Sequence, residues 1–183
     1  MAWLLSHVIV LRNFSEVAVG KWGPAASAVL PVEIGRFYVF LAVAVVAACD
    51  AGAYFAGRAY GKHKLAPFIS PGKTVEGAVG GVLAGVLMAF LVRSIFTLAW
   101  PETLPAGDGI AWLMTGVAGI ILSLAGIVGD LIESLLKRDA AVKDTGTLIP
   151  GSGGVLDRID SHLLAIPTLY YLLLTYTYLR LEH

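Results

Sequence analysis

The stretch that decides the fold is residues 134–160, SLLKRDAAVKDTGTLIPGSGGVLDRID. It is polar and punctuated by glycine, and it separates two stretches that are apolar enough to lie in a membrane. Lipid tails cannot solvate its charged side chains, so such a cluster between membrane helices needs water, a metal ion or an anionic ligand as its partner. The contrast therefore predicts a chemical site at a membrane surface.

The composition of the whole chain agrees with this interpretation. The 183 residues are 57% hydrophobic and 14% charged, whereas a soluble domain is nearer a quarter charged. We therefore expect an all-α polytopic membrane protein. The formal net charge is zero, so overall charge gives no reason to expect a nucleic-acid partner, and anion binding has to come from local clusters.

The apolar windows predict four membrane spans. A spanning helix needs about 20 mostly apolar residues, and residues 34–57, 78–100, 110–136 and 159–179 meet this requirement. Residues 17–30 allow a fifth, shorter piece, because Gly23 and Pro24 interrupt them. We expect an N-terminal partial or interfacial segment at 1–33, a membrane-embedded catalytic domain at 34–180, and a tag remnant at 181–183.

Two helices separate the polar loops 58–77 and 134–160, so both loops are expected on one side of the membrane. That side carries most of the basic residues near the spans: Arg58, Lys62, Lys64, Lys73, Lys137, Arg138, Lys143 and Arg158. The opposite side has Arg36, Arg93 and Arg180. By the positive-inside rule both polar loops are cytoplasmic, which is typical of a protein of the bacterial inner membrane.

The third span ends in GIVGDLIESLLKR, which places Asp130 inside an apolar run and Glu133, Ser134 and Lys137 on the same helical face. An ionised aspartate at membrane depth costs about 2.5–3.5 kcal/mol on insertion scales, so it is expected to serve a function with a cation or metal ion as its partner. The alternative is an internal salt bridge from Asp130 or Glu133 to Lys137.

The loop that follows supplies more oxygen ligands. Asp144, Asp157 and Asp160 are carboxylates, and neighbouring glycines leave backbone amides open to a phosphate. Carboxylates beside glycines and lysines suit Mg²⁺ with a nucleotide, because Mg²⁺ prefers one or two carboxylates, several waters and substrate phosphate oxygens. The alternative interpretation of LDRID is a pair of acidic residues at a helix N-terminus.

The loop between the first two spans ends in ISPGKTVEG, where Ser70, Lys73 and Thr74 offer donors to an anion near the start of a helix. It is not a P-loop, because Pro67 stands where that motif needs glycine. The alternative is a plain helix start with Ser70 as N-cap, Pro71 as the first helical residue and Lys73 reaching towards lipid phosphates.

The first span contains a second intramembrane carboxylate, Asp50, in the sequence ACDAGAYFAGR. Arg58 lies two turns further on, where it could pair with Asp50 or meet lipid headgroups. Gly52 and Gly57 would let another helix pack closely against this one. In the next span, Gly80, Gly81 and Gly85 offer a close-packing face, from which a homodimer is plausible.

With these residues identified, the segment 134–160 resembles the signature of the phosphatidate cytidylyltransferases, or CDP-diacylglycerol synthases. The residues that fall in register are Ser134, Lys137, Arg138, Lys143, Asp144, Pro150, Gly151, Gly153, Gly154, Asp157, Arg158 and Asp160. The earlier block DAGAYFAGRAYGKHKLAPFISPGKTVEG is similar to another part of that family, and the resemblance spans about residues 22–178. There are two departures: Ser152 replaces the family's histidine and cannot titrate near neutrality, and Ala51 stands where Ser or Thr is usual.

The resemblance implies transfer of a cytidylyl group from CTP to phosphatidate, with CDP-diacylglycerol and pyrophosphate as products. It implies Mg²⁺ as cofactor, with room for a second metal ion, and Asp130, Asp157 and Asp160 as metal ligands. The implied catalytic residues are these three and Lys137. The implied substrate-binding residues are Ser70, Lys73, Thr74, Glu76, Arg138, Lys143, Asp144, Ser152, Gly153, Gly154 and Arg158.

Two other functions stay open at this point. A CTP-dependent lipid kinase of the polyprenol or phytol type would transfer the γ-phosphoryl group and release CDP instead of pyrophosphate. A membrane transporter or scaffold could also bury carboxylates between helices, and it would form no metal-dependent product.

Overall fold

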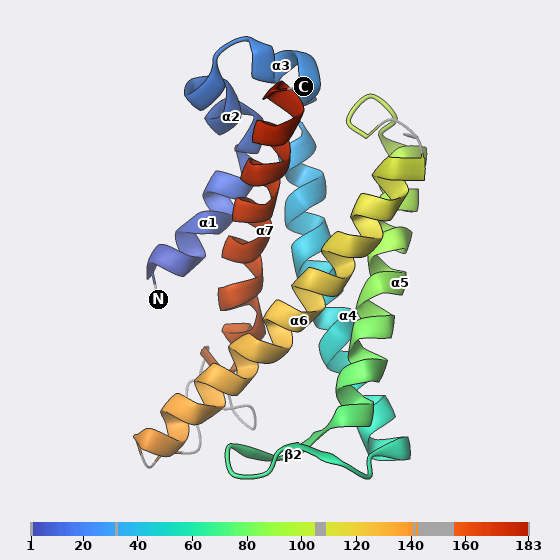
Figure 1. The fold of residues 1–183 in the computed structure, drawn as a ribbon, viewed down its shortest axis with the longest axis vertical. Coiled ribbons are helices and arrows are strands. Elements are labelled where there is room, and N and C mark those ends of the chain that lie inside the picture. Colours follow the sequence, from blue (N-terminus) through green and yellow to red (C-terminus); the bar gives the residue numbers. More distant parts are fainter. Residues whose placement is uncertain (1, 32, 105–108, 141, 143–155, 183) are drawn as a thin grey trace.

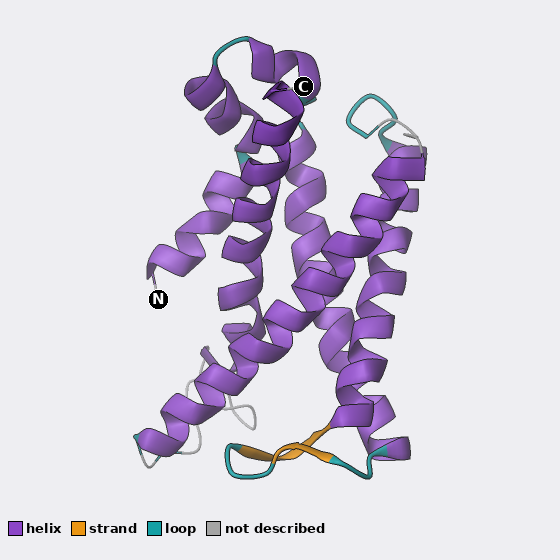
Figure 2. Ribbon diagram, in the orientation of Figure 1, coloured by secondary structure: helices purple, strands orange, loops and turns teal. Residues whose placement is uncertain are grey.

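The structure is a computed structural model that describes residues 2–31, 33–104, 109–140, 142 and 156–182 (Figure 1). The described part is a bundle of helices with one small antiparallel sheet at its end (Figure 2). The elements in chain order are α1 (Ala2–Arg12), α2 (Phe14–Trp22), α3 (Ala25–Val29), α4 (Ile34–Tyr60), β1 (Lys64–Ala66), β2 (Ser70–Thr74), α5 (Val75–Ala99), α6 (Gly109–Asp139) and α7 (Leu156–Glu182).

Three helices, α4, α5 and α6, are long and apolar enough to cross a membrane. They confirm the first three predicted spans to within a few residues at each end. The fourth predicted span also forms a long helix, α7, but among the described residues it is not one of the three that meet this criterion. Residues 17–30 lie largely in the short helices α2 and α3.

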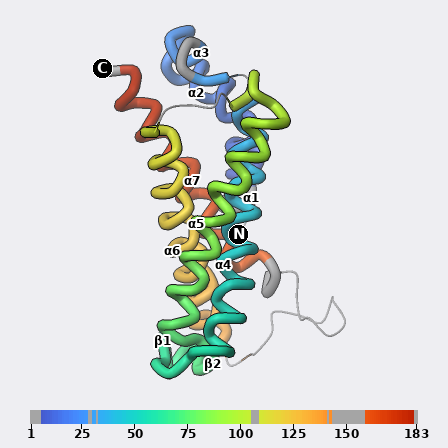
Figure 3. The backbone as a smooth tube through the Cα atoms, turned by 90° about the vertical axis from the view of Figure 1, so that its right-hand side faces the viewer, coloured from blue at the N-terminus to red at the C-terminus, as the bar shows by residue number. Residues whose placement is uncertain are grey.

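α2 and α3 lie at the end of the bundle where α7 finishes, and α1 runs alongside α7 (Figures 1 and 3). α1 contacts α7 and α4, and Leu11 and Phe14 are fully buried there. The rings of Tyr38 and Tyr170 meet Phe14 edge-on, with centroids 5.7 and 6.2 Å away. This segment therefore contributes to the same core as the long helices.

Glycine brings α4 and α5 into close contact. A methyl group on Gly81 would lie 2.8 Å from the Cys49 carbonyl oxygen, and one on Gly52 would lie 3.0 Å from the Gly80 carbonyl oxygen. Such separations are available only to residues without a Cβ. The prediction that Gly52 allows close packing is therefore confirmed.

The three glycines of α5 do not form a face for a second copy. Gly80 and Gly81 face α4, and Gly85 faces Ser123 of α6. The interpretation of these glycines as a dimer face is therefore wrong, because contacts within the chain already use them. A homodimer stays a prediction and needs another surface.

Candidate functional site

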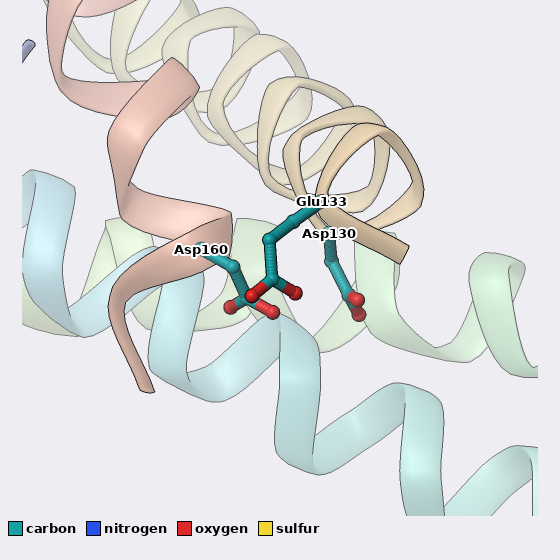
Figure 4. Close-up of side chains that lie close together, drawn as sticks. All are labelled: Asp130, Glu133 and Asp160. Carbon is teal, nitrogen blue, oxygen red and sulfur yellow. The ribbon is translucent and has the colours of Figure 1, made fainter. Parts of the chain in front are cut away.

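Three carboxylates from two helices meet at one end of the bundle. Asp130 and Glu133 lie one turn apart on α6, and Asp160 lies near the start of α7. One oxygen from each lies within 4.8 Å of the others. Figure 4 shows the three side chains pointing towards one another. The prediction that Asp130 and Asp160 belong to one site agrees with this arrangement.

Two lysines pair with the carboxylates on α6. The Nζ atom of Lys73 lies 2.5 Å from Oδ2 of Asp130, and the Nζ atom of Lys137 lies 2.6 Å from Oε2 of Glu133. The predicted alternative of an internal salt bridge to Lys137 is therefore observed, and its acidic partner is Glu133. Asp130 instead pairs with Lys73 of β2, so the first polar loop reaches the carboxylates of α6.

The donor set fits a hard divalent cation. Glu133 is only 4% exposed, and negative charges this close repel one another unless cations balance them. Two lysine ammonium groups face three carboxylates, so these five groups together keep a negative charge when all are ionised. Mg²⁺ is usually bound through one or two carboxylates together with water and substrate phosphate oxygens, and this cluster offers oxygen ligands of that kind.

Ser161 links the cluster to a fourth carboxylate. Its backbone N–H donates to Oδ1 of Asp160 at 2.7 Å, and its hydroxyl lies 3.4 Å from oxygens of both Asp160 and Asp50. Asp50 thus belongs to the same polar network. Arg58, the partner considered for Asp50, instead donates to the hydroxyl of Tyr54 at 3.1 Å.

A cavity of about 510 Å³ lies beside this network. Its walls come from α4, α5, α6, α7 and β2, and its polar lining includes Asp50, Lys73, Thr74, Asp130 and Asp160. The size is within the range of small-ligand sites. A ligand there would meet carboxylates and an ammonium group on one side and apolar helix surface on the other.

The first polar loop contains a β-hairpin, a strand pair that its prolines and glycines do not predict. β1 and β2 pair antiparallel, with Lys64 opposite Thr74 and Ala66 opposite Ser70. α5 begins after this hairpin, and Thr74 is its N-cap, because the Thr74 hydroxyl accepts from the backbone N–H of Gly77 at 3.1 Å. The alternative of Ser70 as N-cap is therefore wrong.

Glu76 holds the base of the hairpin. Its carboxylate accepts from the backbone N–H groups of Lys62 and His63 at 3.1 and 3.2 Å, and it lies 2.6 Å from Nδ1 of His63. A contact between Glu76 and a substrate stays a prediction.

Replacing Glu76 with alanine is expected to loosen the hairpin. The amides of Lys62 and His63 would lose their acceptor, and each such hydrogen bond contributes about 0.5–1.5 kcal/mol or more. We expect roughly tenfold faster hydrogen–deuterium exchange at these amides, measured by mass spectrometry. Glu102→Ala, an exposed site elsewhere, is the control. Unchanged exchange at these two amides would show that Glu76 does not anchor the hairpin.

The remaining predicted residues fall into three groups. Arg138 is exposed, and its Nε donates to the Ile69 carbonyl at 3.4 Å, so it reaches the hairpin. Lys143, Asp144, Ser152, Gly153 and Gly154 lie outside the described residues. Asp157 and Arg158 lie in the first turn of α7, with side chains that are outside the described part. The predicted pairing of Asp130 with Asp157 is therefore untested.

Sequence reasoning missed two members of the network. The helical pattern puts Glu133 on the same face of α6 as Asp130, but Glu133 is not among the predicted metal ligands. Its spacing of three residues from Asp130 is the signal that could have identified it as one. Asp50 was singled out as an intramembrane carboxylate without a site role. Its proximity to Ser161 depends on how α4 packs against α7, which no local pattern encodes.

Comparison with known proteins indicates the same family as the sequence motifs do. A family model described as the cytidylyltransferase family matches residues 4–176. The chain is 42% identical over 141 residues to a phosphatidate cytidylyltransferase of Bacillus subtilis, covering 77% of this chain and 49% of the relative. It is 45% identical over 138 residues to one of Haemophilus influenzae, covering 75% and 46%. A relative from Staphylococcus saprophyticus is 45% identical over 140 residues, covering 76% and 50%. The chain spans about half the length of these relatives.

Proposed function

The chain belongs to the cytidylyltransferase family, and on that premise we propose that it transfers the cytidylyl group of CTP to phosphatidate. The products are CDP-diacylglycerol and pyrophosphate. The observation that carries the proposal is the ion pair between Lys73 and Asp130, which joins the first polar loop to the carboxylate cluster beside one cavity. Relatives named phosphatidate cytidylyltransferase supply the substrate class.

The reaction forms one bond and breaks one. A phosphate oxygen of phosphatidate attacks the α-phosphorus of CTP, and the bond from that phosphorus to the bridging oxygen breaks. Pyrophosphate leaves with the electron pair. No covalent enzyme intermediate is needed, so the protein has to position two anions and balance their charge.

The residues of the cluster are suited to that task. Asp130, Glu133 and Asp160 would hold Mg²⁺, which when bound supplies charge neutralisation and orientation of phosphate oxygens. Lys73 and Lys137 place ammonium groups beside the same carboxylates, where they can balance phosphate charge. The predicted role of Asp157 as a further ligand is part of this proposal.

The membrane arrangement supports access for both substrates. We propose that α7 is a fourth span beside α4, α5 and α6, and that both polar loops face the cytoplasm at the bacterial inner membrane. The hairpin, the end of α6 and the start of α7 lie towards the same end of the bundle (Figure 1). The basic residues of these loops favour that side by the positive-inside rule. CTP would then arrive from water and phosphatidate from lipid.

Product analysis tests this proposal. Purified protein is incubated with CTP, phosphatidate and Mg²⁺, and we expect CDP-lipid and pyrophosphate in equal amounts. Omitting Mg²⁺ or adding a chelator should abolish both products. Phosphorylated lipid with CDP would instead indicate a kinase, and no product together with no stabilisation by CTP would contradict an enzyme of this class.

A further inference from the structure

A second cavity lies at the opposite end of the bundle. It has a volume of about 530 Å³, and each of the four long helices lines both it and the first cavity. On α5, Gly77 lines the first cavity and Arg93 lines the second. At 1.5 Å per residue they are about 24 Å apart along the helix. This separation approaches the roughly 30 Å hydrocarbon thickness of a bilayer, so the second cavity lies towards the other membrane face.

A buried arginine forms part of this cavity. Arg93 belongs to a helix that is apolar enough to span a membrane, yet it is only 5% exposed. Its Nη1 donates to the Thr115 hydroxyl at 3.2 Å, and its guanidinium lies 5.0 Å from the Trp112 ring centroid. The side chain therefore turns towards α6 instead of extending into lipid. A cation held at this depth indicates a functional site.

A second guanidinium lines the same cavity. Arg180 lies near the end of α7, where its Nε donates to the Tyr176 hydroxyl at 3.1 Å. Tyr176 and Tyr38 line the cavity as well. Two arginines and two phenol groups thus provide several donors that converge on one space. Arginine's planar set of donors suits phosphate oxygens.

Apart from Thr115, the rest of the described lining is apolar, and the charged side chains in the lining are all positive. Residues such as Phe37, Leu41 and Leu169 form the walls, and among the described lining residues there is no Asp or Glu. Glu33, which precedes the first lining residues of α4, pairs with Arg12 at 3.3 Å and with Arg36 at 2.8 Å. The described part of the cavity thus combines positive charge with an apolar wall. This combination is complementary to an anionic amphiphile.

We propose that this cavity binds a membrane lipid with an anionic phosphate headgroup. The headgroup lies between Arg93 and Arg180, and an acyl chain lies along the apolar wall formed by α4, α6 and α7. The site is separate from the carboxylate cluster, and it serves to stabilise the bundle, because all four long helices contribute to it. A ligand that binds only the folded form raises stability by mass action.

Lipid titration followed by native mass spectrometry tests the proposal. The delipidated protein in non-ionic detergent is titrated with phosphatidylglycerol or with phosphatidylcholine of the same acyl chains. We expect phosphatidylglycerol to bind at least tenfold more tightly and to raise the melting temperature. Arg180→Gln should weaken its binding by roughly tenfold, and Arg93→Gln by more, because hydrogen bonds to charged groups are lost.

Matched variants separate this site from general attraction of acidic lipid. Arg36→Gln removes the same charge at the same end, from a half-exposed side chain outside the cavity lining, and should leave affinity unchanged. Arg180 is also exposed, so we expect Arg180→Gln to fold. Its lipid affinity can therefore be measured even if Arg93→Gln fails to fold. Arg93→Lys, which keeps the charge, should retain part of the affinity.

Three results would overturn the proposal. The first is equal binding of the two lipids, and the second is a loss for Arg36→Gln as large as that for Arg180→Gln. In the third, inorganic phosphate at the same concentration displaces the lipid, which would reassign the cavity to free phosphate. Retention of one phosphatidylglycerol per chain in the presence of phosphate supports the lipid site.

Discussion

Asp130→Asn is expected to lower Mg²⁺-dependent formation of CDP-lipid by roughly 10²- to 10³-fold, a loss typical of removing one preorganised electrostatic contact. Asparagine has nearly the same shape as aspartate, but it carries no charge and offers a single acceptor oxygen. The substitution removes the carboxylate that pairs with Lys73 and that meets Glu133 and Asp160. Charge balance at the phosphates would fail while the helix remains intact.

The measurement is kcat/KM for CDP-lipid over a range of Mg²⁺ concentrations, together with the melting temperature. Asp139→Asn is the matched control, because Asp139 is an exposed aspartate at the end of the same helix. We expect the control to keep activity within about twofold, since surface substitutions rarely change stability by more than about 0.5 kcal/mol. Near-normal turnover by Asp130→Asn would remove this residue from the metal site.

A double-variant cycle separates the metal role of Asp130 from its ion pair with Lys73. Lys73→Gln alone breaks the ion pair and leaves the three carboxylates in place. If Asp130 acts mainly through the ion pair, then Lys73→Gln, Asp130→Asn and the double variant should show equal losses. If Asp130 binds metal, only the two variants that lack its carboxylate should need more Mg²⁺.

Gly81→Ala is expected to destabilise the fold by about 1–3 kcal/mol or more, although it adds a single methyl group. That methyl would lie 2.8 Å from the Cys49 carbonyl oxygen and 3.0 Å from the Ala53 Cβ. The backbone of α4 would have to move to make room. The same change at Gly20, which has no neighbouring atom within 4 Å, should instead stabilise its helix by about 0.5–1 kcal/mol.

Thermal unfolding in detergent measures both effects. The two variants carry the same chemical change in a helix, so opposite signs isolate the contact between α4 and α5. Equal shifts in melting temperature would show that this contact is not tight in the membrane protein.

The sequence predicts the long helices well and their contacts poorly. Apolar windows define α4, α5 and α6 to within a few residues, because exclusion from water acts along each segment independently. The hairpin was missed because Pro67, Pro71 and Gly72 dominate its short strands and give turn signals. Its strands pair Lys64 with Thr74 and Ala66 with Ser70, and Glu76 accepts from the backbone N–H groups of Lys62 and His63 just before β1.

The candidate site was predicted in its chemistry and only partly in its membership. Charge inside an apolar run identified Asp130, and the carboxylates of the following polar segment identified Asp160. The ion pair of Asp130 with Lys73, and the approach of Asp50 to Ser161, join segments far apart in the chain. They depend on the angles at which the helices cross, and these angles are set by packing over the whole bundle.

The glycine contacts also constrain how the molecule can change shape. α4 and α5 touch almost backbone to backbone, so neither can slide or tilt without the other. The two helices therefore move together as one rigid unit. Gly57 and Gly77 extend this contact to the level of the first cavity. Any widening that admits a lipid tail sideways from the bilayer therefore has to come from displacement of α6 or α7.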